Sequence, residues 1–136
     1  MPDGHHQARS IRHVGAVVGV PLLIAAGAFA GANLRHVLGA ELVGLWGTLA
    51  ANALGSVLLG VLLYEARFAG RLSRETRLLV GTGLLSSFTT YSTFVLEAVT
   101  ATPLVGLGYV VLSYGLGLTG VLLGRWIART AVGDVS

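Results

Sequence analysis

The sequence lacks cysteine and lysine, and its 136 residues include only three prolines and one methionine. Without cysteine the chain has no disulfide framework and no thiol chemistry. Charged residues make up 11% of the chain, whereas a soluble globular domain carries about 25%. Hydrophobic residues make up 54%, and the mean hydropathy is +0.78. This composition excludes an ordinary soluble domain and indicates a membrane protein.

Charge is missing from four long stretches, which cover residues 13–34, 42–64, 78–96 and 98–124. Each stretch meets or approaches the roughly 20 residues that a helix needs to cross about 30 Å of hydrocarbon. We therefore predict an all-α membrane protein, with one transmembrane domain over residues 14–129. Its four transmembrane helices are expected at about residues 14–34, 42–64, 78–99 and 104–127. The remaining residues, 1–13 and 130–136, are predicted to be cytoplasmic tails.

All nine basic residues are arginines, and they lie at helix ends or in short loops. With four crossings, the N-terminal tail, the middle loop and the C-terminal end share one side of the membrane. That side holds eight arginines: Arg9, Arg12, Arg67, Arg71, Arg74, Arg77, Arg125 and Arg129. The other side holds only Arg35. The positive-inside rule predicts a multi-pass protein of the cell membrane with both termini in the cytoplasm. Despite a pI of about 10.0, this placement indicates topology and not nucleic-acid binding.

A polar segment, Ser86–Phe94, interrupts the third apolar stretch, and Glu97 follows it. Six of its nine residues are Ser or Thr. Their hydroxyls compete for backbone hydrogen bonds, and unwound backbone is tolerated at membrane depth only where it is buried or lines a cavity. Exposed carbonyls at such a break form a ready cation site. The segment predicts that the third helix is broken near its middle.

Polar residues also recur at helical spacing in the second and fourth stretches: Thr48, Asn52 and Ser56, and Tyr109 and Ser113 followed by Gly117. Hydroxyls, amides and aromatic ring edges can all present positive hydrogen ends to an anion. These residues fit either a polar pathway or a purely structural polar seam. No enzyme is predicted, because the only intramembrane acid, Glu97, has no second acid to pair with.

Three segments resemble the signatures of the CrcB/Fluc fluoride channels. They are GAFAGANLR at residues 27–35, GTLAANALGS at residues 47–56, and FTTYSTF at residues 88–94 followed by Glu97. The resemblance covers all four predicted helices in the right order. It implies a fluoride-selective passive channel that exports fluoride and lowers its cytoplasmic concentration. It also implies an antiparallel dimer with two pores and a central sodium ion (Na+).

The resemblance assigns roles to individual residues. It implies a fluoride path lined by Asn52, Tyr91, Phe94, Thr48, Ser113, Tyr109 and Glu97. Arg35 would lie in an aqueous vestibule, where it would raise the local anion concentration. The backbone carbonyls of Ser86 and Thr89 would hold the sodium ion. The chain departs from the family pattern at Ser86-Ser87, where Gly-Gly is usual, and at Tyr91, where Phe is usual.

The arginine asymmetry adds a hypothesis about the partner. A homodimer whose subunits insert in opposite directions needs nearly balanced arginines on the two sides, but this chain has eight against one. We therefore expect one half of a heterodimer, paired with a homologous subunit of inverted charge bias. Two other classes stay as alternatives: a small four-helix multidrug-type transporter and a non-conducting membrane scaffold subunit. Such transporters place an essential acid in the first helix, and residues 14–34 contain none.

Overall fold

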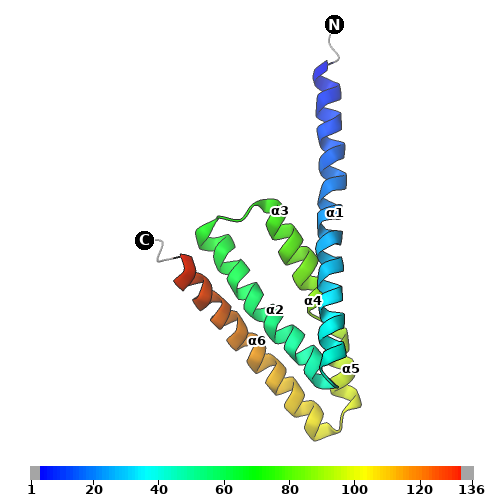
Figure 1. Ribbon diagram of the computed structural model, residues 1–136, viewed down its shortest axis with the longest axis vertical. Coiled ribbons are helices and arrows are strands. Elements are labelled where there is room, and N and C mark those ends of the chain that lie inside the picture. The colour runs from blue at the N-terminus through cyan, green and yellow to red at the C-terminus, as the bar shows by residue number, and fades with distance from the viewer. Residues whose placement is uncertain (1–3, 133–136) are drawn as a thin grey trace.

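The computed structural model describes the backbone of residues 4–132 and the side chains of residues 18–131. Its elements are α1 (Gly4–Glu41), α2 (Leu45–Tyr64), η1 (Glu65–Ala69), α3 (Arg74–Arg77), η2 (Leu78–Leu85), α4 (Ser86–Phe88), α5 (Ser92–Thr100) and α6 (Pro103–Val132) (Figure 1). The segments η1 and η2 are π-helical, so their turns are wider than those of an α-helix. Four segments are long and apolar enough to span a membrane: Val18–Glu41, Leu45–Ala69, Arg74–Thr100 and Pro103–Ala131. The predicted all-α architecture with four membrane-length helices is confirmed.

Two helices extend beyond the apolar stretches from which they were predicted. α1 begins at Gly4 and ends at Glu41, instead of covering residues 14–34, and α6 continues to Val132. Charged residues end an apolar run but not a helix, because Arg and Glu are good helix formers. The ends of the two expected tails, residues 1–3 and 133–136, lie outside the described residues.

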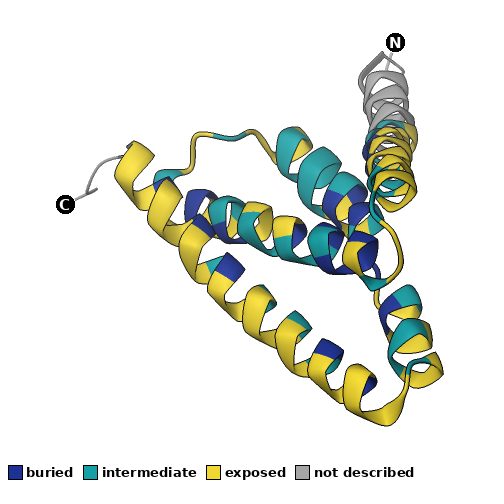
Figure 2. Cartoon of the chain, turned by 60° about the horizontal axis from the view of Figure 1, so that its bottom comes forward, coloured by how far each residue is buried: buried dark blue, intermediate teal, exposed yellow. Residues whose placement is uncertain are grey.

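α2 lies at the centre of the bundle. α6 packs along one side of it, the η2–α4 segment lies on the other, and α1 covers the far side of η2 (Figure 1). Buried residues collect along α2, whereas much of α1 and α6 is exposed (Figure 2). The exposed faces are apolar: Phe29 is 74% exposed and Leu104 83% exposed. Helix faces of this kind suit a surrounding of lipid or of a second membrane subunit.

Small residues allow the helices to approach closely at two seams. Gly27 and Gly31 of α1 lie against the backbone carbonyls of Leu79 and Leu84, so a methyl group at either glycine would overlap a carbonyl oxygen. Gly124 of α6 lies in the same way against the α2 backbone. Close approach of backbones is how small residues promote packing between membrane helices. Gly27 and Gly31 therefore form the strip along which α1 packs closely against η2.

The third span is interrupted at Thr89–Tyr91. The first half ends at Phe88, Thr89 has extended backbone angles (φ −78°, ψ 155°), and helix resumes at Ser92. The predicted break near the middle of the third helix is confirmed. It places unwound backbone beside α2.

The connection between the second and third spans is held by Glu65. Its Oε1 accepts a hydrogen bond from Leu72 N at 2.5 Å, and its Oε2 lies 3.4 Å from Arg77 Nε. Gly70 supplies the left-handed turn between them, with φ of 61°. Ser73 then caps α3, because its hydroxyl accepts a hydrogen bond from Thr76 N.

Candidate functional site

Asn52 pairs with the unwound backbone at the break. Its Nδ2 donates to Thr90 O at 2.9 Å, and its Oδ1 accepts from Thr90 N at 2.8 Å. Both polar groups of one peptide residue are therefore satisfied by a single side chain from α2. This matters because an unsatisfied backbone group costs several kcal/mol in hydrocarbon. Asn52 thus holds the break against α2.

The same hydrogen bonds divert two donors from their helical acceptors. In an unbroken helix Thr90 N would donate to Ser86 O, but it donates to Asn52. Likewise Thr93 N would donate to Thr89 O, but it donates to Thr90 Oγ1 at 3.3 Å. The carbonyls of Ser86 and Thr89 are thereby released from the helical ladder. Backbone carbonyls in this position suit a hard cation, because such cations prefer oxygen ligands.

Glu97 joins three helices through its two carboxylate oxygens. Thr48 Oγ1 on α2 donates to Oε1 at 2.9 Å, and Tyr109 OH on α6 donates to Oε2 at 2.7 Å. Ser113 lies one turn beyond Tyr109, and its buried hydroxyl has no hydrogen-bond partner among the described residues. The structure therefore brings together four of the polar residues singled out from the sequence: Thr48, Glu97, Tyr109 and Ser113. We call this set the polar track.

Aromatic rings cover one side of the polar track. The centroid of the buried Phe94 ring is 5.3 Å from that of Tyr109, and Tyr114 meets Phe94 edge to face at 6.2 Å. The ring of Tyr91 lies 5.8 Å from Phe94 but is 71% exposed. Of the two aromatic residues that the resemblance places on the fluoride path, Phe94 is buried within the protomer and Tyr91 faces outward.

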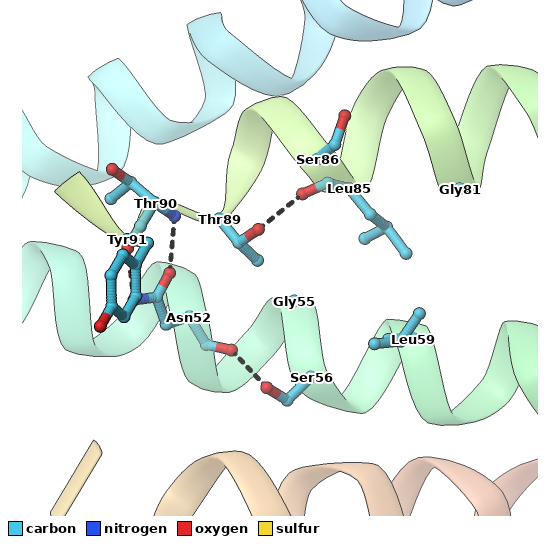
Figure 3. A pocket seen from close by; sticks show the side chains of 10 residues that line it. All are labelled: Asn52, Gly55, Ser56, Leu59, Gly81, Leu85, Ser86, Thr89, Thr90 and Tyr91. Carbon is cyan, nitrogen blue, oxygen red and sulfur yellow. Dashed lines mark hydrogen bonds between the residues drawn. The ribbon is translucent and has the colours of Figure 1, made fainter. Parts of the chain in front are cut away.

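Two grooves meet at Asn52. The first, of about 460 Å³, lies between α2 and the η2–α4 segment; its lining residues are drawn in Figure 3. The second, of about 290 Å³, faces α6 and is lined by Phe94, Ser113, Tyr114 and Gly117 among others. Asn52, Ser56 and Tyr91 line both grooves. These three side chains therefore form the wall between the two grooves.

Arg35 lies apart from the polar track, in a third groove of about 430 Å³. His36, Thr90 and Thr93 also line this groove. Thr90 thus connects the surroundings of Arg35 with the groove beside Asn52, because it lines both.

Three residues at the site were not assigned a role from the sequence: Ser56, Thr90 and Tyr114. The spacing of Asn52 and Ser56, four residues apart, pointed to Ser56. Thr90 pairs with Asn52 through its backbone and with Thr93 N through its Oγ1, and the sequence did not distinguish it from the neighbouring hydroxyl residues. Tyr114 follows Ser113 directly, so a search for residues on one helical face passes over it.

Four membrane-length helices that bring hydroxyl, amide and carboxylate groups together are typical of a small membrane transport protein. Residues 22–125 match the family described as CrcB-like protein, Camphor Resistance (CrcB). The chain is 50% identical over 112 residues to fluoride-specific ion channel FluC 1 of Haloarcula marismortui, covering 82% of this chain and 87% of the relative. It is 45% identical over 126 residues to FluC 2 of Halobacterium salinarum, covering 86% and 98%. It is 42% identical over 118 residues to FluC of a Roseiflexus species, covering 79% and 95%.

The chain therefore belongs to the CrcB/FluC family of fluoride-specific ion channels. The family identified from three sequence motifs is confirmed. It is a family of ion channels and not of enzymes, in agreement with the sequence prediction.

Proposed function

We propose that this chain is a subunit of a fluoride-selective passive channel that exports fluoride and lowers its cytoplasmic concentration. The observation that carries the proposal is the polar track beside the pairing of Asn52 with the Thr90 backbone, which we call the Asn52 clamp, within a family whose relatives are named fluoride-specific ion channels. A passive path for a small anion needs hydrogen-bond donors that replace water at membrane depth. The chain offers such donors without a basic residue among the groups of the track.

The proposed fluoride path uses hydrogen-bond donors that are not engaged in hydrogen bonds within the protein. Asn52 spends one of its two N–H groups on Thr90 and keeps the other for a ligand. Ser113 has a buried hydroxyl with no partner among the described residues. The ring edges of Phe94 and Tyr91 carry partial positive charge and add weak attraction for an anion. Thr48 and Tyr109 fix the carboxylate of Glu97 at the side of this path.

A sodium ion fits the break in the third span. The carbonyls of Ser86 and Thr89 would hold it, because the donors that would otherwise occupy them bind Asn52 and Thr90. When bound, the ion would supply fixed positive charge beside the unwound backbone. Sodium retention by the purified protein, measured by elemental analysis after dialysis into potassium salts, tests this assignment.

Arg35 is proposed to line a vestibule on the side opposite the other arginines. It shares its groove with Thr90 and Thr93, which lie at the break. A positive charge in a wet concave surface raises the local concentration of anions and their association rate. Arg35 would therefore act on fluoride before fluoride loses its water.

The chain is proposed to insert with both termini in the cytoplasm and to form an antiparallel dimer with a homologous subunit of opposite orientation. The η1–α3 connection carries four arginines and lies at the end of the bundle opposite the α1–α2 connection near Arg35 (Figure 1). The count of eight against one favours a single orientation, so the oppositely oriented subunit is expected to be a different chain. The outward-facing ring of Tyr91 would then meet that subunit.

Fluoride efflux from proteoliposomes tests the channel. Vesicles loaded with potassium fluoride and treated with valinomycin are followed with a fluoride electrode, for this chain alone and co-purified with a relative of inverted arginine bias. The expected result is fluoride efflux from the pair without matching chloride efflux. Asn52→Ala is expected to stop it, whereas Asn33→Ala, which removes an exposed amide bonded to Phe29 O of its own helix, is not.

The outcomes separate the two parts of the proposal. Robust efflux from this chain alone would contradict the heterodimer and leave the channel in place. Absence of fluoride efflux from every pairing would overturn the channel itself.

A further inference from the structure

Ser56 occupies a position that neither the polar track nor the Asn52 clamp explains. It lies one turn beyond Asn52 on α2 and lines both the first and the second groove. Figure 3 shows its side chain between Asn52 and Leu59 at the edge of the first groove. A hydroxyl that lines two adjoining grooves can interact with an ion that passes from one to the other.

The surface opposite Ser56 on α6 is bare. Gly117 lies one turn beyond Ser113, and a methyl group placed on Gly117 would be 3.7 Å from Ser56 Oγ, in ordinary van der Waals contact. No other heavy atom outside its own helix backbone lies within 4 Å of that position among the described residues. The row of polar side chains at four-residue spacing on α6 therefore stops at Ser113, and Ser56 of α2 adds a hydroxyl to the same groove.

The single hydrogen bond of the Ser56 hydroxyl allows rotation about its Cα–Cβ bond. The hydroxyl donates to Asn52 O, four residues earlier in the same helix, at 2.8 Å. A backbone carbonyl has two lone pairs, so Asn52 O can keep a helical partner when the serine hydroxyl rotates away. Rotation about one side-chain bond would free this donor for a ligand in the second groove, which Ser113 also lines with a hydroxyl that has no partner among the described residues.

We propose that Ser56 is a further residue of the anion path: it extends the polar track from Ser113 across to α2, where Gly117 leaves room for the ion. This assignment rests on the proposed fluoride channel. The ligand is a small anion that accepts two hydroxyl donors, one from Ser56 and one from Ser113. Ser56 then has two states, bonded to Asn52 O in the empty path and bonded to the ion when it passes.

The test uses fluoride efflux from proteoliposomes containing whichever form of the wild-type protein conducts. Ser56→Ala is expected to lower efflux by about tenfold, the effect of one lost hydrogen-bond donor. Ser56→Cys, which keeps nearly the same volume but offers only a weak S–H donor, is expected to lower it similarly. The matched control is Thr119→Ala, which removes an exposed hydroxyl bonded to Gly115 O four residues earlier, and it is expected to conduct like wild type.

Rescue from the opposite helix distinguishes a path residue from a structural one. In the Ser56→Ala background, Gly117→Ser places a hydroxyl across the same groove and is expected to restore most of the efflux, whereas Gly117→Ala is not. Wild-type efflux from Ser56→Ala, or equal rescue by Ser and Ala at position 117, would overturn the assignment of Ser56 alone. Absence of fluoride efflux from the wild-type protein in every pairing would overturn the proposed function, and this assignment with it.

Discussion

Two glutamates that are at least partly buried, Glu65 and Glu97, have very different hydrogen-bond and ion-pair partners. Glu65, at the end of α2, is 8% exposed and lies 3.4 Å from the guanidinium of Arg77, with a backbone N–H as a second partner. Glu97, inside the third span, is half-buried, and its partners are the neutral hydroxyls of Thr48 and Tyr109. Among the described residues, no ion pair is formed by Glu97.

We propose that this difference separates a residue that anchors the fold from a residue that belongs to the ion path. Glu65 has a structural explanation, because its bonds to Leu72 N and Arg77 join the two ends of the connection between the second and third spans. An acid at membrane depth without a cation is costly, and such residues usually belong to ion or substrate pathways. We therefore expect substitutions of Glu65 to change stability and substitutions of Glu97 to change conduction.

The largest effect is expected from Glu97→Gln. Glutamine can still accept from Thr48, but its NH₂ group cannot accept from Tyr109, so the polar track loses its fixed arrangement. Fluoride efflux per folded protein should fall by roughly 100-fold, equivalent to about 2.7 kcal/mol. Efflux near the wild-type level would show that the carboxylate is only a packing group.

Glu65→Ala should lower the stability of the protein and leave its fluoride efflux unchanged, in contrast to Glu97→Gln. It leaves Leu72 N and Arg77 without their partner and should destabilise the folded protein by about 2 kcal/mol, measured by thermal unfolding in detergent. Because the Arg77 side chain is 35% exposed, part of the ion pair is screened by solvent and the loss stays moderate. Efflux per folded protein should not change. If the variant were fully stable but had low efflux, Glu65 would have to be assigned to conduction and not to stability.

Tyr109→Phe should have a smaller effect than the change at Glu97. It keeps the ring that packs on Phe94 and removes one of the two hydroxyl donors to the carboxylate. Efflux should fall by about tenfold, since one donor is lost and the other remains. The control is Tyr64→Phe, at a buried tyrosine beside Phe68 at the far end of α2. Equal effects at the two tyrosines would mean that hydroxyl loss acts through stability.

Arg35→Gln should have the smallest effect and a different signature. In the proposed vestibule its charge would act on hydrated anions, so efflux should fall by only about two- to threefold at low ionic strength. The difference should vanish as salt shortens the screening length. Efflux measured at about 20 mM and about 500 mM potassium salt, where the Debye length is about 21 Å and about 4 Å, checks this. A loss that is independent of salt would indicate that Arg35 contacts the ion directly.

Much of this arrangement could be predicted from the sequence. Four charge-free stretches specified the spans, because hydrocarbon tolerates so little charge that its absence marks each helix. The hydroxyl residues of Ser86–Phe94 predicted the break for a local reason, competition for backbone hydrogen bonds. Each of these predictions depends on neighbouring residues in the chain.

The contacts between helices could not be predicted in the same way. Spacing places Thr48 and Asn52 on one face of α2, but it does not reveal how α2 is rotated against the third span. Glu97 meets a hydroxyl 49 positions away, and Asn52 meets a backbone 38 positions away. The π-helical turns of η2 shift the register of everything after them, and spacing rules that assume 3.6 residues per turn miss that shift.

The pairing of Asn52 with Thr90 resembles a rung of a β-ladder in which a side-chain amide takes the place of the second strand. An amide on a one-carbon stem has the two groups and the reach that this rung requires. Aspartate could accept but not donate, and glutamine would carry the amide one methylene too far. The residue that shapes the backbone is also the one proposed to meet the ion. Position 52 therefore cannot be altered for selectivity without also altering the architecture of the third span.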